Sequence, residues 1–421
     1  MRVLLTLLLL CLLLPLLFFG RVGEKLANHR PAAGPEWSLA NWWSGGFQTG
    51  AARRLNEQFG ARNTLVRWNN QKDYSIFNHP TARDVVIGKD DYLFEDTYLE
   101  AATGGNYQGR KHFDELGGQL RSLRDSLTRM NVDLLVMMAA GKGSYFPEFH
   151  PEPYASRPPA RTNEEELLRV LQINRIDHLN FNAWFRDMKS TTAHPLFPKL
   201  GIHWTKYGQY LVMDSLINYL EINRQMDMPD LMLDSLEISP EQRGTEADIY
   251  LGMNLFGKPA GYPLAYPHWR VENPDKPQPK VLVVGDSFYW SLYLHQGLSD
   301  KFFAGGDFWY YFNRVMRGGQ DRGAASELDL KHELAKYDLV ILWETESHYH
   351  RLSNGFLKAA LRAFAAPPDP ATAERELLKI VNEIRAKPEW LAYMQEKALA
   401  RNQPLDTVVW REARYVFDRR E

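Results

Sequence analysis

The stretch Lys280–Leu298, "KVLVVGDSFYWSLYLHQGL", decides how the fold is interpreted. An apolar strand runs up to Gly285, which permits a sharp turn, and Ser287 follows at the head of a helix expected to begin near Phe288. In an open α/β sheet, ligands bind beyond the carboxyl ends of such strands. The Ser287 hydroxyl is therefore either a nucleophile aimed at that crevice or, like Asp286, only the cap of the next helix.

Further apolar strands alternate with helices along the chain. "VDLLVMMAA", "IDHLN" and "YDLVILWE" are such strands, and "DVVIGKDDYLFE" has the pattern of a hairpin. Apolar strands that alternate with helices predict an α/β fold in which a parallel sheet is covered by helices on both faces.

The composition excludes several classes of protein. The 421 residues carry a formal charge of −2 and are 13% aromatic, which argues against a disordered chain and against a general nucleic-acid binder. Cys11 is the single cysteine, so the chain forms no internal disulfide.

The first residues, "MRVLLTLLLLCLLLPLLFFG", predict the compartment. The apolar run Val3–Phe19 approaches the length of about 17–25 residues that spans a bilayer as a helix. Because no A-x-A-like cleavage site follows, we expect an uncleaved inner-membrane anchor rather than a removed signal peptide. The remainder of the chain is then exported, and we place it in the periplasm.

Composition and periodicity divide the chain into four parts. We expect a membrane anchor or signal at 1–22, a tether at 23–50, an α/β domain at 51–355 and a charged, amphipathic helical tail at 356–421.

A serine nucleophile needs a base, and His203 is the histidine best placed to serve. The stretch "FPKLGIHWTKYGQY" holds His203 in a short loop before a helix, with Thr205 as the expected N-cap. Such a loop also suits the rim of the crevice at which Ser287 is expected.

Five stretches together resemble the periplasmic alginate O-acetyltransferases that carry a domain similar to SGNH hydrolases. They are "FGARNTLVRWNN", "VVIGKDDYLFE", "AGKGSYFPEF", "FPKLGIHWTKYG" and "VVGDSFYWSLY", spread over residues 50–355. Their order supports the resemblance, because the histidine block precedes the serine block as in this family, whereas ordinary SGNH hydrolases carry the serine first.

The resemblance implies that Ser287 is the acyl nucleophile and His203 the general base. The family's motif is Asp-x-His-Trp, and Gly201 stands at the Asp position, so another carboxylate must orient the ring, a Ser–His dyad must suffice, or the protein is a non-catalytic binder. The carboxylates that we consider for this role are Glu344, Glu346 and Asp177.

Oxyanion or substrate contacts are expected near the same crevice. The backbone N–H of Ser287 is one candidate donor. The other candidates are Gly285, at the end of its strand, and Lys142, Ser144 and Tyr145 of the loop after "VDLLVMMAA".

The stretch "WETESHYHRL" also raises the question of a metal site. Its Glu344, Glu346, His348 and His350 are ligand types, but no second ligand cluster accompanies them in the sequence. We therefore assign no metal and no cofactor.

These observations favour an exported O-acetyltransferase acting on an alginate-like exopolysaccharide. A carbohydrate esterase and a catalytically silent polysaccharide-binding or scaffold protein remain the alternatives. The resemblance further implies a multipass membrane acyltransferase as the partner that supplies acetyl groups, and no nucleic-acid partner is expected.

Overall fold

The structure is a computed structural model, which describes residues 5–7, 25–29, 34–58, 60–365, 370–401 and 403–419. Apart from residues 5–7, the anchor expected at 1–22 lies outside these residues. Within the described part of the chain, no helix is both long enough and apolar enough to cross a membrane.

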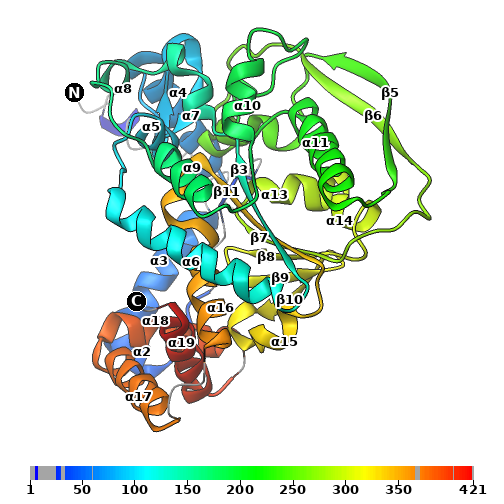
Figure 1. Ribbon diagram of the computed structural model, residues 1–421. Helices are drawn as coiled ribbons and strands as arrows, with labels where there is room; N and C mark the ends of the chain where they lie inside the picture. The colour runs from blue at the N-terminus through cyan, green and yellow to red at the C-terminus, as the bar shows by residue number, and fades with distance from the viewer. Residues whose placement is uncertain are drawn as a thin grey trace.

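The centre of the molecule is a seven-stranded sheet (Figure 1). Its strand order is β10-β9-β8-β7-β11-β3-β4, and β11 forms parallel ladders with β7 on one side and β3 on the other. The strands are β3 Asp133–Ala139, β4 His178–Asn180, β7 Val281–Gly285, β8 Asp307–Tyr310, β9 Arg314–Arg317, β10 Gln320–Ala324 and β11 Leu339–Thr345.

The sheet is mixed, which corrects the expectation of a purely parallel one. Strands β8 and β9, and β9 and β10, pair antiparallel. Short connections join these strands, and such connections cannot return the chain to a parallel start. Between β9 and β10 the turn is Gly318-Gly319, both at positive φ, a two-residue hairpin signal that the sequence carries openly.

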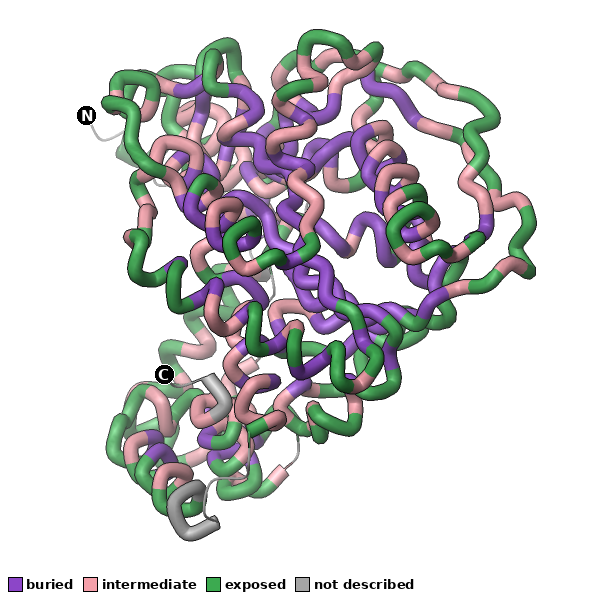
Figure 2. The backbone as a smooth tube through the Cα atoms, viewed as in Figure 1, coloured by how far each residue is buried: buried purple, intermediate pink, exposed green. Residues whose placement is uncertain are grey.

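Alternating side chains of the central strands fill two separate cores. In β7, Val281 and Val283 belong to one core while Leu282 and Val284 belong to the other. The same alternation holds along β11 and β3. Because both faces are covered, these strands appear in the sequence as unbroken apolar runs, and the buried backbone in Figure 2 follows them.

Helices form the outer two layers. The first core contains residues of α10 Phe181–Met188, α11 Lys206–Arg224 and α14 Leu298–Lys301. The second contains residues of α6 Arg110–Thr128, α9 Asn163–Ile173, α15 Leu330–Leu334 and α16 Phe356–Phe364.

Two hairpins and a helical bundle complete the fold. The expected hairpin is present as β1 Val85–Ile87 and β2 Leu93–Glu95. A longer one, β5 Asp230–Ser239 with β6 Leu264–Glu272, lies in a region without clear periodicity. The tail forms α17 Pro370–Ala386, α18 Pro388–Arg401 and α19 Leu405–Arg419, which share their own core.

The remaining helices join these parts. The α-helices are α2 Leu39–Trp43, α3 Gly46–Gln58, α4 Arg62–Phe77, α5 Asp96–Ala102, α7 Lys142–Tyr145, α8 Glu152–Ala155, α12 Asp248–Met253 and α13 Phe288–Trp290. The 3₁₀ segments are η2 Lys89–Asp91, η3 Pro147–Phe149, η4 Gly244–Ala247, η6 Ala325–Glu327 and η7 Glu346–Gly355, and η5 Ser291–Gln296 is a π-helix.

Candidate active site

Ser287 lies two residues after the end of β7, at the carboxyl edge of the sheet. Its backbone is already helical and its side chain makes no capping bond to α13. The neighbouring Asp286 takes that role, since its carboxylate accepts from the Phe288 N–H at 3.0 Å. The capping interpretation thus applies to Asp286, and the Ser287 hydroxyl is left to interact elsewhere.

His203 brings its ring to this hydroxyl. The distance from His203 Nε2 to Ser287 Oγ is 3.3 Å, although the residues are 84 positions apart. Thr205 caps α11, as expected, by accepting from the Gly208 N–H. The Trp204 indole is fully buried beneath the loop and donates to Ser291, so the histidine loop is fixed to the first turns after Ser287.

Asp248 is the carboxylate behind the imidazole. Its Oδ2 lies 2.5 Å from His203 Nδ1, and its Oδ1 accepts from the N–H groups of Ile202 and Ile249 at 2.9 and 2.8 Å. One side chain therefore orients both the ring and the backbone that carries it. With Ser287, these residues have the arrangement of a Ser–His–Asp triad.

The position of Gly201 explains why the acid comes from another segment. A Cβ at residue 201 would lie 2.5 Å from the carbonyl oxygen of Thr245 and 2.7 Å from the carbonyl carbon of Glu246. Buried Glu246 holds this segment in place by accepting from the Lys206 N–H and the Tyr266 hydroxyl. The chain that delivers Asp248 thus occupies the space that a longer side chain at 201 would need.

Electrostatics favour the protonated form of the ring. Burial disfavours the charged imidazole, but the hydrogen bond to Asp248 and the charges of Asp248 and Glu95 outweigh it and raise the pKa of His203 above its ordinary 6.5. Burial, followed by the charge of Asp248, in turn raises the pKa of the Glu95 carboxyl. A ring of raised pKa is a stronger base toward a serine hydroxyl.

Tyr311 is a further residue at the site. Its phenol hydrogen-bonds with Ser287, and burial followed by the charge of Asp286 raises its pKa well above the ordinary value, so the phenol stays protonated. Tyr311 and Phe312 both have positive φ, 48° and 50°. Left-handed backbone is costly for two consecutive aromatic residues, and such strain is often stored at functional sites.

None of the three carboxylates considered from the sequence contacts His203 in the described part of the chain, which corrects that expectation. Asp177 precedes β4 and so lies at the amino end of a strand that runs parallel to β3, away from the carboxyl edge. Glu344 accepts from Asn354 and from the Ser353 N–H. Glu346 accepts from the Ser144 N–H, and burial raises its pKa to about 8.

The residues considered as oxyanion or substrate contacts have structural partners. Lys142 is fully buried, and its Nζ donates to the carbonyl oxygens of Leu93, Lys199 and Gly201, so it braces the histidine loop from below. Burial lowers its pKa well below the ordinary value.

The other three residues of this group also have structural roles. Tyr145 packs in the core against Phe146 and Phe197. A Cβ at Gly285 would lie 2.4 Å from the Trp343 carbonyl oxygen, which requires glycine there. Ser144 lines a separate pocket of about 310 Å³ together with Glu346.

A comparison with known proteins identifies the family of the chain. A family model described as "SGNH hydrolase-like domain, acetyltransferase AlgX" matches residues 85–304, just over half of the chain. The chain belongs to this family. The matched range contains His203, Asp248 and Ser287. No curated protein matches the sequence.

Several solved structures are similar to this chain. The O-acetyltransferase domain of Pseudomonas putida AlgJ is 16% identical with a TM-score of 0.44, covering 65% of this chain and 93% of that one. Pseudomonas aeruginosa AlgX is 18% identical with a TM-score of 0.43, covering 66% of each chain. Bacillus cereus PatB1, solved with a sulfonyl adduct, is 11% identical with a TM-score of 0.41, covering 63% of this chain and 97% of that one.

Replacing the acid should change both rate and pH profile. A general base must be neutral, so wild-type activity should fall as pH drops through the raised His203 pKa, above 6.5. Asp248→Asn removes a charge that stabilises the imidazolium, so the acidic limb should move to lower pH and kcat should drop by about 10³–10⁴-fold. The measurement is kcat/KM against pH with an aryl acetate.

Glu95→Gln is the matched control for this variant. It removes a nearby charge without removing a hydrogen bond to the ring. The acidic limb of its pH profile should therefore also move to lower pH, while kcat stays within about tenfold of the wild type. An Asp248→Asn profile that overlays the wild type would contradict the assigned role.

Restoring the family's acid at position 201 should damage the enzyme rather than improve it. In Gly201→Asp the new Cβ would meet the backbone of Thr245 and Glu246, displacing the segment that carries Asp248. We expect at least a roughly tenfold loss of kcat and a lower melting temperature. Gly118→Asp is the control, because a Cβ there meets nothing within 4 Å. A faster Gly201→Asp enzyme would refute the argument from crowding.

Proposed function

We propose that this protein is an O-acetyltransferase that moves an acetyl group, through an ester of Ser287, onto a hydroxyl of an alginate-like exopolysaccharide. The observation that carries the proposal is the His203 imidazole held between Asp248 and Ser287 at 2.5 and 3.3 Å. Family membership supports the acetyl group as the one transferred.

In the first half-reaction His203 Nε2 takes the proton of the Ser287 hydroxyl as Oγ attacks the acetyl carbonyl carbon. Asp248 stabilises the imidazolium that forms. When the tetrahedral intermediate collapses, the bond to the donor breaks and His203 returns the proton to the departing oxygen. The product is acetyl-Ser287.

The second half-reaction reverses these roles. A sugar hydroxyl gives its proton to His203 Nε2 and attacks the acetyl carbonyl carbon. The bond to Ser287 Oγ then breaks, and His203 returns the proton to the serine. Candidate donors to the oxyanion in both steps are the Ser287 backbone N–H and the Tyr311 phenol, which stays protonated because its pKa is raised.

Half-exposed aromatic rings beside Ser287 support a sugar as the acceptor. Trp290 and Tyr310 lie 5.3 Å apart by ring centroids, and Tyr310 and Tyr311 lie 4.5 Å apart. The C–H faces of sugar rings pack on aromatic rings of this kind. Such packing would place a hydroxyl at the ester and displace the water that would otherwise hydrolyse it.

The silent-binder alternative rested on the glycine at position 201, and Asp248 removes that reason. The esterase alternative has the same catalytic residues. Water and the sugar hydroxyl compete for one acetyl-serine, so the partition between them distinguishes the two enzymes.

Incubation of the protein with an aryl acetate should place one acetyl group on Ser287. Intact-mass and peptide mass spectrometry would locate it. Ser287→Ala should remain unlabelled and lose about 10³-fold or more in turnover, whereas Ser144→Ala, in the neighbouring pocket, should be labelled like the wild type. Acetyl on another residue, or equal labelling of Ser287→Ala, would refute a serine ester.

Adding an oligosaccharide acceptor should lower acetate release and produce acetylated sugar. Trp290→Ala should shift this partition back toward water, because the sugar loses a packing surface, while acylation stays close to wild type. Acetate release that is indifferent to every acceptor would favour the esterase.

We further propose that residues 1–22 anchor the protein in the inner membrane with the folded part in the periplasm. The tryptophans of the tether support this, since Trp37, Trp42 and Trp43 are all exposed, and tryptophan is enriched at membrane interfaces. A multipass membrane acyltransferase is the proposed source of acetyl groups, and an anchor would keep the two proteins in one membrane.

Fractionation of cells that express the full chain should find it in the membrane pellet with residues 1–22 still present by intact mass. The chain beginning at residue 23, directed to the periplasm by a cleavable signal, should appear in the soluble fraction. If cells that express the full chain yield protein that lacks residues 1–22, these residues are a removed signal peptide.

A further inference from the structure

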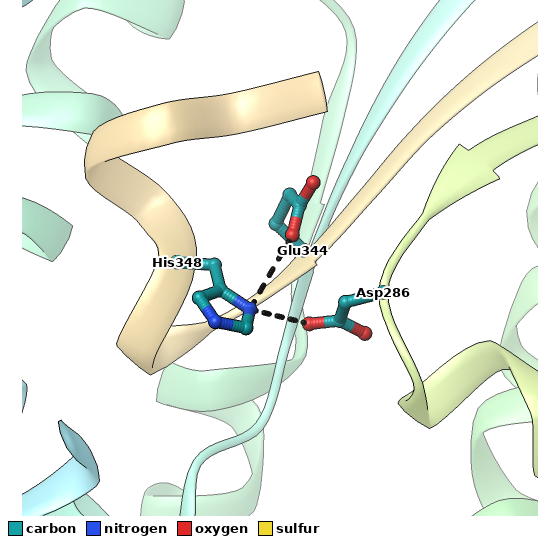
Figure 3. A group of neighbouring side chains, drawn as sticks. All are labelled: Asp286, Glu344 and His348. Atoms are coloured by element: carbon teal, nitrogen blue, oxygen red, sulfur yellow. Dashed lines mark ion pairs between the residues drawn. The ribbon is translucent and has the colours of Figure 1, made fainter. Parts of the chain in front are cut away.

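A second cluster of ionisable side chains lies behind the Ser287 turn. Asp286 follows β7, Glu344 belongs to β11, and His348 lies in η7, so three separate elements bring them together (Figure 3). Asp286 and Glu344 have no solvent exposure, and the His348 side chain is 16% exposed.

The spacing of the three groups suits a shared cation better than direct hydrogen bonds. His348 Nδ1 lies 3.5 Å from an Asp286 oxygen and 3.8 Å from Glu344 Oε2, and one ligand atom from each residue falls within 4.8 Å of the others. Ligands bound to Zn²⁺ at about 2.0–2.1 Å in a tetrahedral site lie about 3.3–3.5 Å apart. Contraction by a few tenths of an ångström brings the His348 distances into that range.

Hydrogen bonds from neighbouring residues already fix both carboxylates. Asp286 Oδ1 accepts from the Phe288 N–H, and Asp286 Oδ2 accepts from the N–H and the hydroxyl of Thr345. Glu344 Oε1 accepts from the Ser353 N–H and the Asn354 amide. Ligands of metal sites are typically held in this way by a surrounding layer of partners.

Two of the atoms that face the centre of the cluster lack a hydrogen-bond partner. Glu344 Oε2 and His348 Nδ1 are buried and have no hydrogen-bond partner, yet they face each other. Buried polar atoms without a partner in a native protein call for an unseen ion or water.

We propose that Asp286, Glu344 and His348 bind one divalent first-row cation, Zn²⁺ in particular, at a site distinct from the His203–Ser287 pair. Imidazole nitrogen and carboxylate oxygen are both ligand types of zinc, and three protein ligands leave a fourth position open to water. The imidazole disfavours Mg²⁺, which prefers oxygen donors. The sequence stretch "WETESHYHRL" contains ligand types but is not accompanied by a second set of ligands. The fold adds a ligand from another segment, Asp286.

The cation would act on the position of Ser287 rather than in a bond-making step. Asp286 immediately precedes Ser287, so fixing its carboxylate to β11 and η7 would lock the turn that presents the nucleophile. The partly exposed edge of His348 gives the cation access from solvent.

The test uses the full chain, stripped with a chelator and dialysed against Zn²⁺ or Mg²⁺, with bound metal measured by atomic spectroscopy. We expect about one Zn²⁺ per chain, a higher melting temperature with Zn²⁺, and no retained Mg²⁺. Less than about 0.1 Zn²⁺ per chain would overturn the proposal.

Three variants locate the ion. His348→Ala should weaken Zn²⁺ binding by at least roughly tenfold. His350→Ala, in the same turn but outside the cluster, and His203→Ala, which removes the imidazole beside Ser287, should both bind like the wild type. Retention by His348→Ala, or loss in His203→Ala, would overturn this site whatever the outcome for acetyl transfer.

Discussion

The structure of the site depends on the carboxylate of Asp248. It accepts at three points, from the His203 ring and from the N–H groups of Ile202 and Ile249, so ring orientation and loop conformation are set by one group. Without it, the imidazole would lose both its tautomer preference and its fixed distance to Ser287. The surrounding elements keep this carboxylate in place: Glu246 ties its segment to the start of α11, and Lys142 braces the loop from the opposite side.

This arrangement separates the acid from the histidine motif by 45 residues. In this chain the backbone of Thr245 and Glu246 lies where a side chain at position 201 would project, so Gly201 lets the segment that carries Asp248 pack against the histidine loop. A motif search that requires Asp-x-His-Trp would therefore pass over a chain whose spatial triad is complete.

Sequence reasoning predicted the elements with a strong local signal. The unbroken apolar runs of β3, β7 and β11 predicted buried central strands, and Thr205 predicted where α11 begins. The sequence also predicted that His203 and Ser287 share one crevice, although the His203 loop lies between α10 and α11 and not directly after a strand.

Asp248 was missed because it is the first residue of a six-residue helix in a region without periodicity. Its contact with His203 depends on how the β5–β6 hairpin returns the chain, which no local pattern encodes. The antiparallel edge was missed for a different reason, since the Gly318-Gly319 turn was present in the sequence but β8 and β9 are only four residues each.

The two cores lie on opposite faces of the central sheet, and each face carries a different part of the molecule. The histidine loop packs on the side of α10 and α11, whereas the C-terminal bundle docks through α19 onto α16, which covers the other face of the sheet (Figure 1). Arg411 of α19 also pairs with Glu327 on that second side. The C-terminal bundle therefore lies on the opposite side of the sheet from the histidine loop, so a contact made through the bundle would leave the crevice at Ser287 uncovered.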